Sequence, residues 1–82
     1  MSTEHTVPSR VIAVIAEILG SEEEQINDEM SLEALQADSL DVVEICIALE
    51  NEFNIDIWDE EILALETVQQ VIDLVSDKVS DE

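Results

Sequence analysis

The chain of 82 residues is long enough for one small domain but too short for a deep catalytic cavity with its own lid. Its 22 acidic side chains outweigh 2 lysine and arginine side chains, and the formal net charge of −20 excludes nucleic acid and anionic membrane surfaces as partners. Because 46% of the residues are hydrophobic and only 2% are aromatic, we expect a folded domain with an aliphatic core that attracts basic partners.

The first predicted element is an amphipathic helix that begins at Val7. Apolar side chains recur from Val7 to Leu19 at spacings of three and four residues, the period of one helix face. Thr6 can cap the start of this helix, and Pro8 is tolerated because it falls in the first turn. Gly20 can adopt the left-handed conformation that ends a helix.

The segment 21–37 is polar and acidic, with isolated apolar anchors. It predicts a long, ordered loop that can hold one short helical turn, either at residues 21–24 or around Leu32. A second helix is predicted from about 39 to 52, and its wide apolar arc suits a helix that packs against several neighbours. Asp38 can accept hydrogen bonds from the exposed amides of its first turn.

The rest of the chain predicts an extended connector, a short helix and a longer one. Residues 55–57 look briefly strand-like, but no second alternating run could pair with them. Asp59 can cap a short helix through about Leu65, and Thr67 opens a capping-box pattern before a helical run that starts at Val68. The fold class is therefore all-α, a small four-helix bundle with three longer helices, one short helix and a long loop between helices 1 and 2.

The sequence shows no internal repeat, linker or low-complexity segment, so we expect a single domain over residues 1–82 with a core at about 7–79. Cys46 stands alone, which excludes an internal disulfide and suits a small core residue. Since the N-terminus lacks an apolar signal region and no apolar run could span a bilayer, we expect a cytoplasmic monomer.

A motif lies at the start of the second predicted helix: Leu35-Gln36-Ala37-Asp38-Ser39-Leu40-Asp41, followed by Val43-Glu44, Ala48-Leu49-Glu50 and Glu52-Phe53. This pattern closely resembles the acyl carrier proteins of fatty acid and polyketide synthesis. The similarity continues through Asp59-Glu60-Glu61 and the last helix, and covers the chain from about Val7 to Val79. The Asp-Ser-Leu triplet alone would be weak evidence for this family. Together with the matching helix pattern, the acidic surface and the chain length, it makes the resemblance specific.

The resemblance implies that Ser39 is the attachment point of a covalent 4'-phosphopantetheine arm from coenzyme A, on which acyl groups are carried as thioesters. Family carriers commonly have glycine at the position of Gln36 and proline at that of Trp58. The first departure concerns the backbone before Ser39, and the second makes the entrance to the third helix bulkier. The resemblance also implies recognition of partner enzymes by Asp38, Leu40, Asp41, Glu44, Glu50, Glu60 and Glu61.

Ser39 is not expected to act as a catalytic nucleophile. A serine hydroxyl needs an adjacent base to attack at neutral pH, and the single histidine is His5, far away in the sequence. We therefore expect no enzyme activity and no metal site, and a separate phosphopantetheinyl transferase must supply the base and metal that attach the arm. Because Asp38 and Asp41 repel a phosphate at this helix start, the arm should swing freely.

An apolar crevice between the second and third helices is expected to shield the acyl tail, although each of its residues also suits an ordinary core. Trp58 would report on its entrance. The acids around Ser39 would attract basic docking patches on acyl-processing enzymes, and screening by salt would keep each complex brief. The expected pocket residues are Val43, Ile47, Leu49, Ile57, Ile62 and Leu65.

Two other functions fit the same residues. The chain could carry aminoacyl or peptidyl intermediates on the same arm, but the acidic residues after Ser39 favour the fatty acid or polyketide type. From a different class, it could be an unmodified acidic adaptor that binds a basic protein through the second helix and uses Ser39 only as a cap. Catalysis by Cys46 is a weak reading, because its neighbours are carboxylates instead of a base and an oxyanion site.

Overall fold

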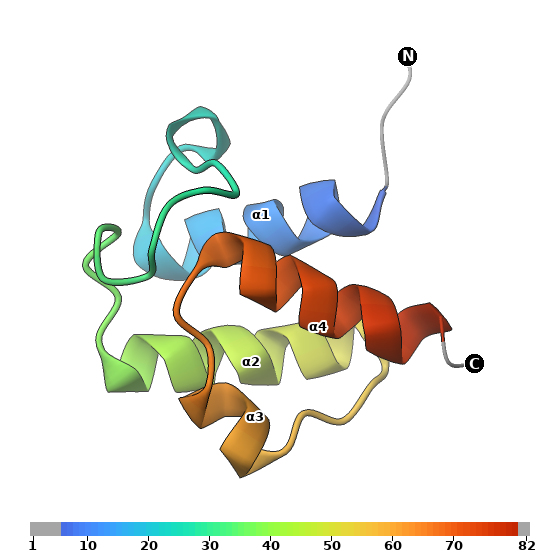
Figure 1. Ribbon diagram of the computed structural model, residues 1–82. Coiled ribbons are helices and arrows are strands. Elements are labelled where there is room, and N and C mark those ends of the chain that lie inside the picture. The colour runs from blue at the N-terminus through green and yellow to red at the C-terminus, as the bar shows by residue number, and fades with distance from the viewer. Residues whose placement is uncertain (1–5, 81–82) are drawn as a thin grey trace.

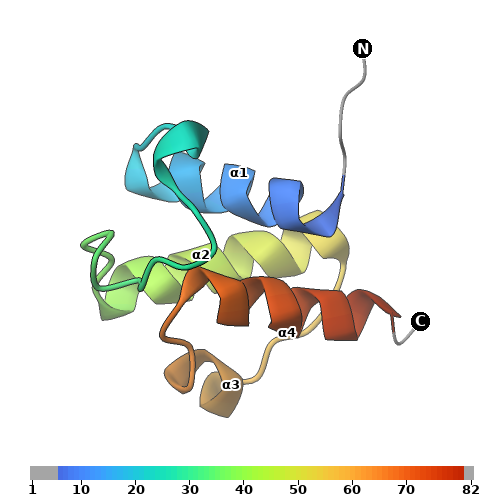
Figure 2. The same ribbon diagram turned by 45° about the horizontal axis from the view of Figure 1, so that its top comes forward.

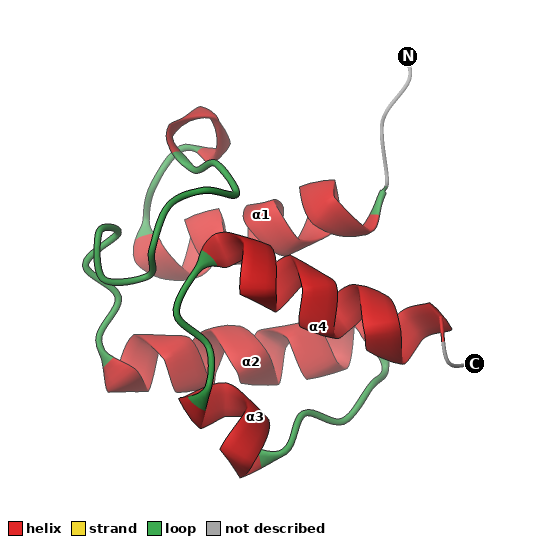
Figure 3. Cartoon of the chain, viewed as in Figure 1, coloured by secondary structure: helices red, strands yellow, loops and turns green. Residues whose placement is uncertain are grey.

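The computed structural model describes residues 6–80, and these residues form a small all-α bundle (Figure 1). The described residues contain no strand, only an isolated bridge between Ser31 and Thr67 (Figure 3). The expected fold class is therefore confirmed. The elements in chain order are α1 (Val7–Leu19), the 3-10 turn η1 (Glu23–Gln25), α2 (Ser39–Phe53), α3 (Asp59–Leu63) and α4 (Val68–Ser80).

The ends of α1 follow from local chemistry that the sequence displays. The Thr6 side chain accepts a hydrogen bond from the Ser9 amide at 3.3 Å, which satisfies one of the amides left without a partner in the first turn. Pro8 lies within that turn, where it removes no helical hydrogen bond. At the other end Gly20 has φ of 70°, a left-handed conformation that glycine adopts without a steric cost.

The shorter helix α3 begins one residue earlier than the sequence indicates. Its N-cap is Trp58, not Asp59, because the Glu61 carboxylate accepts a hydrogen bond from the Trp58 amide at 2.8 Å and holds the chain there. The helix ends at Leu63, two residues before the expected end at Leu65. By contrast α4 starts where expected, with Thr67 and Gln70 making the reciprocal bonds of a capping box, each at 3.1 Å.

The core lies between α1, α2 and α4, which pack side by side, while α3 lies against α2 at the edge of the bundle (Figures 1 and 2). Apart from Cys46, every buried residue is aliphatic, as the composition predicts. Arg10 of α1 pairs with Glu52 of α2 at 3.0 Å and lies over the Phe53 ring at 4.4 Å from its centroid. The largest fully buried side chains are Val11, Ile15, Ile45, Leu49, Val68, Val71 and Val75.

The long loop between α1 and α2 is tied to the start of α4. The Leu32 amide donates to the Glu66 carbonyl at 2.8 Å, and the Val68 amide donates to the Met30 carbonyl at 3.0 Å. Leu32 itself is buried, so the loop contributes a wall to the bundle. Figure 2 shows this loop passing from the end of α1 across the start of α4 to the start of α2. Within residues 6–80, no helix combines the length and apolarity needed to cross a bilayer.

Candidate functional site

Ser39 is the first residue of α2, and its side chain is exposed. The residue that caps this helix is Asp38, whose carboxylate accepts a hydrogen bond from the Asp41 amide at 2.9 Å. In return the Asp41 carboxylate accepts one from the Asp38 amide at 3.2 Å. Because this reciprocal pair caps the helix, the Ser39 hydroxyl is not needed for that purpose.

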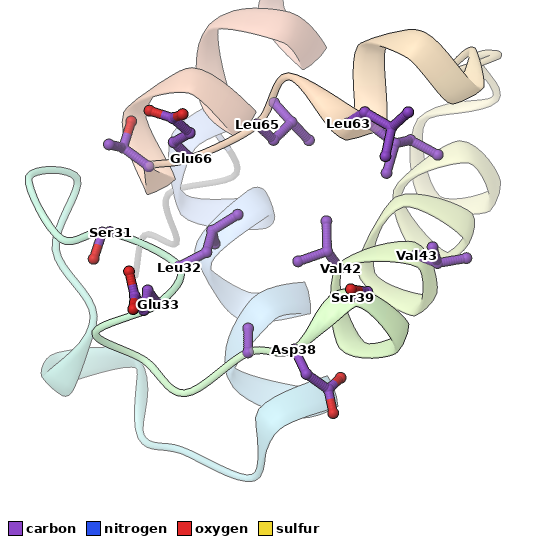
Figure 4. A pocket seen from close by; sticks show the side chains of 13 residues that line it. Ser31, Leu32, Glu33, Asp38, Ser39, Val42, Val43, Leu63, Leu65 and Glu66 are labelled. Atoms are coloured by element: carbon purple, nitrogen blue, oxygen red, sulfur yellow. The ribbon is translucent and has the colours of Figure 1, made fainter.

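A cavity of about 560 Å³ opens beside Ser39, and Ser39 and Asp38 lie on its rim. Figure 4 shows Val42 of α2 and Leu65, which follows α3, facing one another across this hollow. Its lining is mostly aliphatic, and it comes from two stretches far apart in the sequence. One is the loop before α2 with the first turns of α2, and the other runs from α3 to the start of α4. The apolar lining residues are Leu32, Ala37, Val42, Val43, Ile62, Leu63 and Leu65.

Three of the six expected pocket residues line this cavity: Val43, Ile62 and Leu65. The other three lie elsewhere. Leu49 is fully buried in the core between the helices, and Ile47 is exposed on the outer face of α2. Ile57 is buried and lines a second cavity beside α3.

The sequence pattern does not identify four of the lining residues, Leu32, Ala37, Val42 and Leu63. Leu32 and Ala37 reach the cavity because of the hydrogen bond from the Leu32 amide to the Glu66 carbonyl, a contact between distant segments with no local signature. Val42 is three residues after Ser39, a spacing that puts the two side chains on neighbouring positions of one helix face and could have identified it. Leu63 carries no sequence signal, because the short helix gives too few residues to define a periodicity.

The expected recognition acids fall into two groups. Glu44 and Glu60 are exposed, and so is Asp38 beside Ser39. Three others are committed to contacts within the chain, and one of them is Asp41 in the helix cap described above. The Glu50 carboxylate accepts a hydrogen bond from the Ile57 amide at 2.8 Å, and Glu61 forms an ion pair with Lys78 at 3.0 Å.

Glu61 joins α3 to α4. Besides capping α3 through the Trp58 amide, its carboxylate lies 3.0 Å from the Lys78 ammonium group. The hydrogen bond from the Trp58 backbone, followed by that from Lys78, lowers the pKa of Glu61 below its ordinary value of 4.5. The carboxylate is therefore stabilised in its charged form by two segments at once.

The outer face of α2 next to Ser39 carries exposed apolar side chains. Leu40 is 64% exposed and Ile47 is 51% exposed, with Val43 between them at helical spacing. Side chains of this size and exposure contribute little to the core. They form, with Glu44 on the same helix, a mixed apolar and acidic surface beside the serine.

Cys46 lies in the core and is not suited to nucleophilic attack. Burial, followed by the charge of Glu50, raises the pKa of its thiol to about 11. At neutral pH the thiol is therefore protonated and inaccessible. Among residues 6–80 there is no group of three or more metal-ligating side chains, and His5 lies outside the described residues.

Comparisons with known proteins place the whole fold next to known families. A family model described as "Phosphopantetheine attachment site" matches residues 9–75 of the chain. The fold is also similar to the crystal structure of an acyl carrier protein from Thermotoga maritima, with a TM-score of 0.81. The two chains are 28% identical, and the match covers 96% of this chain and 98% of that one.

Proposed function

Because the chain belongs to the acyl carrier protein family, whose cofactor is covalently bound 4'-phosphopantetheine, we propose that Ser39 is the residue that carries this arm. The observation that supports this is the position of its hydroxyl, exposed at the start of α2 on the rim of the 560 Å³ cavity. Asp38 caps the helix, so modification of Ser39 would cost no helix cap.

The residues around Ser39 fit a tethered arm better than a bound anion. Helix starts normally attract phosphate through their exposed amides. Here the Asp38 amide already donates a hydrogen bond to the Asp41 carboxylate, and the Asp41 amide donates one to the Asp38 carboxylate. Two carboxylates so placed repel a phosphate group. The ester bond to the Ser39 oxygen would therefore hold the arm, leaving its thiol end free to carry acyl groups as thioesters between enzymes.

We infer that the chain is a carrier and not itself an enzyme. A serine hydroxyl needs an adjacent base to become a nucleophile, and the side chains flanking Ser39 are Asp38, already engaged as a cap, and the apolar Leu40. A phosphopantetheinyl transferase would supply that base and transfer the arm from coenzyme A. Acyl-processing enzymes would then bind the exposed acids Asp38, Glu44 and Glu60 through basic patches.

The cavity beside Ser39 offers a place for the acyl tail. Val42 and Leu65 face each other across it, and its lining is mostly aliphatic. A saturated chain that leaves the arm and enters this cavity would gain up to about 0.8 kcal/mol per buried methylene. This gain supports a role in shielding acyl intermediates of the fatty acid or polyketide type. The acids Asp41 and Glu44 after Ser39 also favour that type over aminoacyl or peptidyl carriers.

The experiment that tests the attachment site is mass spectrometry of the intact chain. Incubation with coenzyme A and a broad-specificity phosphopantetheinyl transferase should add the mass of one arm to the wild type and none to Ser39→Ala. Ser31→Ala is a matched control, because Ser31 lies on the rim of the same cavity. Ser31→Ala should gain one arm like the wild type.

Two results would contradict the proposal. If the wild type gained no arm, the chain would be better described as an unmodified acidic adaptor. If Ser39→Ala still gained one, the arm would be carried by a different residue.

A further inference from the structure

The short helix α3 carries two large apolar side chains that the fold does not need. Trp58 at its N-cap is 62% exposed and Leu63 at its last position is 85% exposed. Neither side chain belongs to the buried core or packs among its partly buried neighbours. Since isolated exposed apolar residues are common, the arrangement of these two matters more than their number.

Trp58 and Leu63 line the same hollow. A cavity of about 510 Å³ beside α3 is lined by Ile57, Trp58, Asp59, Glu60 and Leu63, and we call it the α3 groove. Leu63 also lines the cavity beside Ser39, so one side chain separates the two hollows. Figure 4 shows Leu63 on α3 at the side of that cavity that faces α2. The α3 groove therefore lies next to the route by which the arm and its cargo leave Ser39.

The rim of the α3 groove is acidic and lacks a cation from its own chain. Asp59 and Glu60 are both exposed. The sequence has 2 lysine and arginine side chains, and both are engaged elsewhere: Arg10 with Glu52 and Lys78 with Glu61, each at 3.0 Å. A lysine or arginine that pairs with Asp59 or Glu60 must therefore come from another molecule.

Charge also decides between the possible occupants. A second copy of this chain would bring a formal charge of −20 against another of −20, and an anionic lipid surface would be repelled in the same way. A protein with basic side chains around a protruding apolar residue suits the α3 groove better. Its basic side chains can pair with the acidic rim, and its apolar residue can contact the apolar walls.

We propose that the α3 groove binds one apolar anchor side chain of a partner enzyme, with basic residues around that anchor pairing with Asp59 and Glu60. This proposal rests on the carrier function proposed above. Exposed acids on α2 attract any basic partner, whereas a groove between Trp58 and Leu63 accepts only a partner whose apolar anchor is correctly placed. The α3 groove thus selects among acyl-processing enzymes after charge has brought them together.

Trp58 provides the measurement, because it is the only tryptophan in the chain. The probe is a short lysine-rich peptide with one leucine, compared with the same peptide carrying serine instead, at about 0.15 M salt. We expect the leucine peptide to bind the full chain roughly tenfold more tightly and to shift Trp58 emission to shorter wavelength. Leu63→Ser should abolish the difference between the peptides. Ala64→Ser, which changes the exposed neighbouring residue, should keep it.

Three results would overturn the proposal: equal binding of both peptides to the wild type, an unchanged difference in Leu63→Ser, or dimerisation of the wild type that Leu63→Ser removes. The same variants, incubated with the transferase and coenzyme A, separate this failure from failure of the carrier function. Leu63→Ser should gain the arm at Ser39 like the wild type. If it does so but the peptides bind equally, the α3 groove is not a docking site and the carrier function stands.

Discussion

The carboxylate of Glu50 accepts a hydrogen bond of 2.8 Å from the backbone amide of Ile57, seven residues further along the chain. This bond fastens the connector after α2 to the last turns of that helix, and a backbone bond from the Ile55 amide to the Glu50 carbonyl at 3.1 Å supports it. Because α3 follows this connector directly and contacts α2, the position of Glu50 sets where α3 begins. It thereby places Leu63, which borders both cavities.

Glu50→Ala is expected to destabilise the chain by about 1 to 2 kcal/mol, because the partly buried Ile57 amide loses its acceptor. Hydrogen exchange at the Ile57 amide should accelerate by more than the change in global stability explains. Glu50→Gln keeps an acceptor oxygen and should lose less than half as much. Equal losses in the two variants would mean that the charge of Glu50, and not its hydrogen bond, holds the connector.

Glu61→Gln should weaken the link between α3 and α4 in a manner that depends on pH. The Trp58 and Lys78 contacts lower the pKa of Glu61 below 4.5, so their stabilisation is fully present above that ordinary value. It is lost as the pH falls through the lowered pKa. The difference in melting temperature between the wild type and Glu61→Gln should therefore be constant above about pH 6 and vanish in acid.

Glu60→Gln is the matched control for that measurement, because Glu60 is exposed and lies beside Glu61. It should cost no stability at any pH, since it only removes one charge from a strongly acidic chain. A pH-independent difference for Glu61→Gln would show that neither the Trp58 contact nor the Lys78 contact favours the charged form of Glu61 in solution.

Gln36→Gly is expected to stabilise the chain by about 0.5 to 1 kcal/mol. Gln36 has φ of 64°, a left-handed conformation that costs a side-chain-bearing residue about 1 to 2 kcal/mol. Glycine removes this strain but adds about 0.4 to 1 kcal/mol of chain entropy in the unfolded state. Thermal unfolding should show a rise of a few degrees. Gln36→Ala keeps the strain and should show none, so an equal rise in both would refute this account.

The sequence predicts the helices well because their ends are local. Thr6, Gly20, Asp38 and Thr67 each act within three or four residues of their own position, and each lies where the pattern indicates. The helix α3 starts one residue earlier than expected. The Glu61 side chain accepts a hydrogen bond from the Trp58 amide, and this bond makes Trp58 the N-cap in place of Asp59.

The cavity could be predicted only in part, because it depends on contacts between distant segments. Val43, Ile62 and Leu65 line it, as the sequence analysis expects of an apolar crevice between the second and third helices. The opposite wall comes from the loop before α2, which is held by a hydrogen bond from Leu32 to Glu66 across 34 positions of chain. Backbone hydrogen bonds of this kind do not depend on side-chain identity, so no sequence motif predicts them.

Cys46 should resist alkylation in the folded chain. With its pKa raised to about 11 from an ordinary 9.0, the thiolate is roughly a hundredfold scarcer than in an exposed cysteine at the same pH below 9. Burial slows the reaction further. Labelling with a thiol reagent at about pH 8 should proceed at the rate of unfolding, and it should be complete in denaturant. Rapid labelling of the native chain would place Cys46 at an accessible surface.

Acyl chains of increasing length on the arm should raise the melting temperature step by step, until the chain fills the cavity beside Ser39. Each methylene that enters adds up to about 0.8 kcal/mol. Ala37→Leu should reduce the rise, because Ala37 lines the cavity and a larger side chain takes up its volume. Ala34→Leu is the matched control, since Ala34 is exposed on the same loop and should leave the rise unchanged. A melting temperature that does not depend on chain length in the wild type would exclude this cavity as the site that shields the tail.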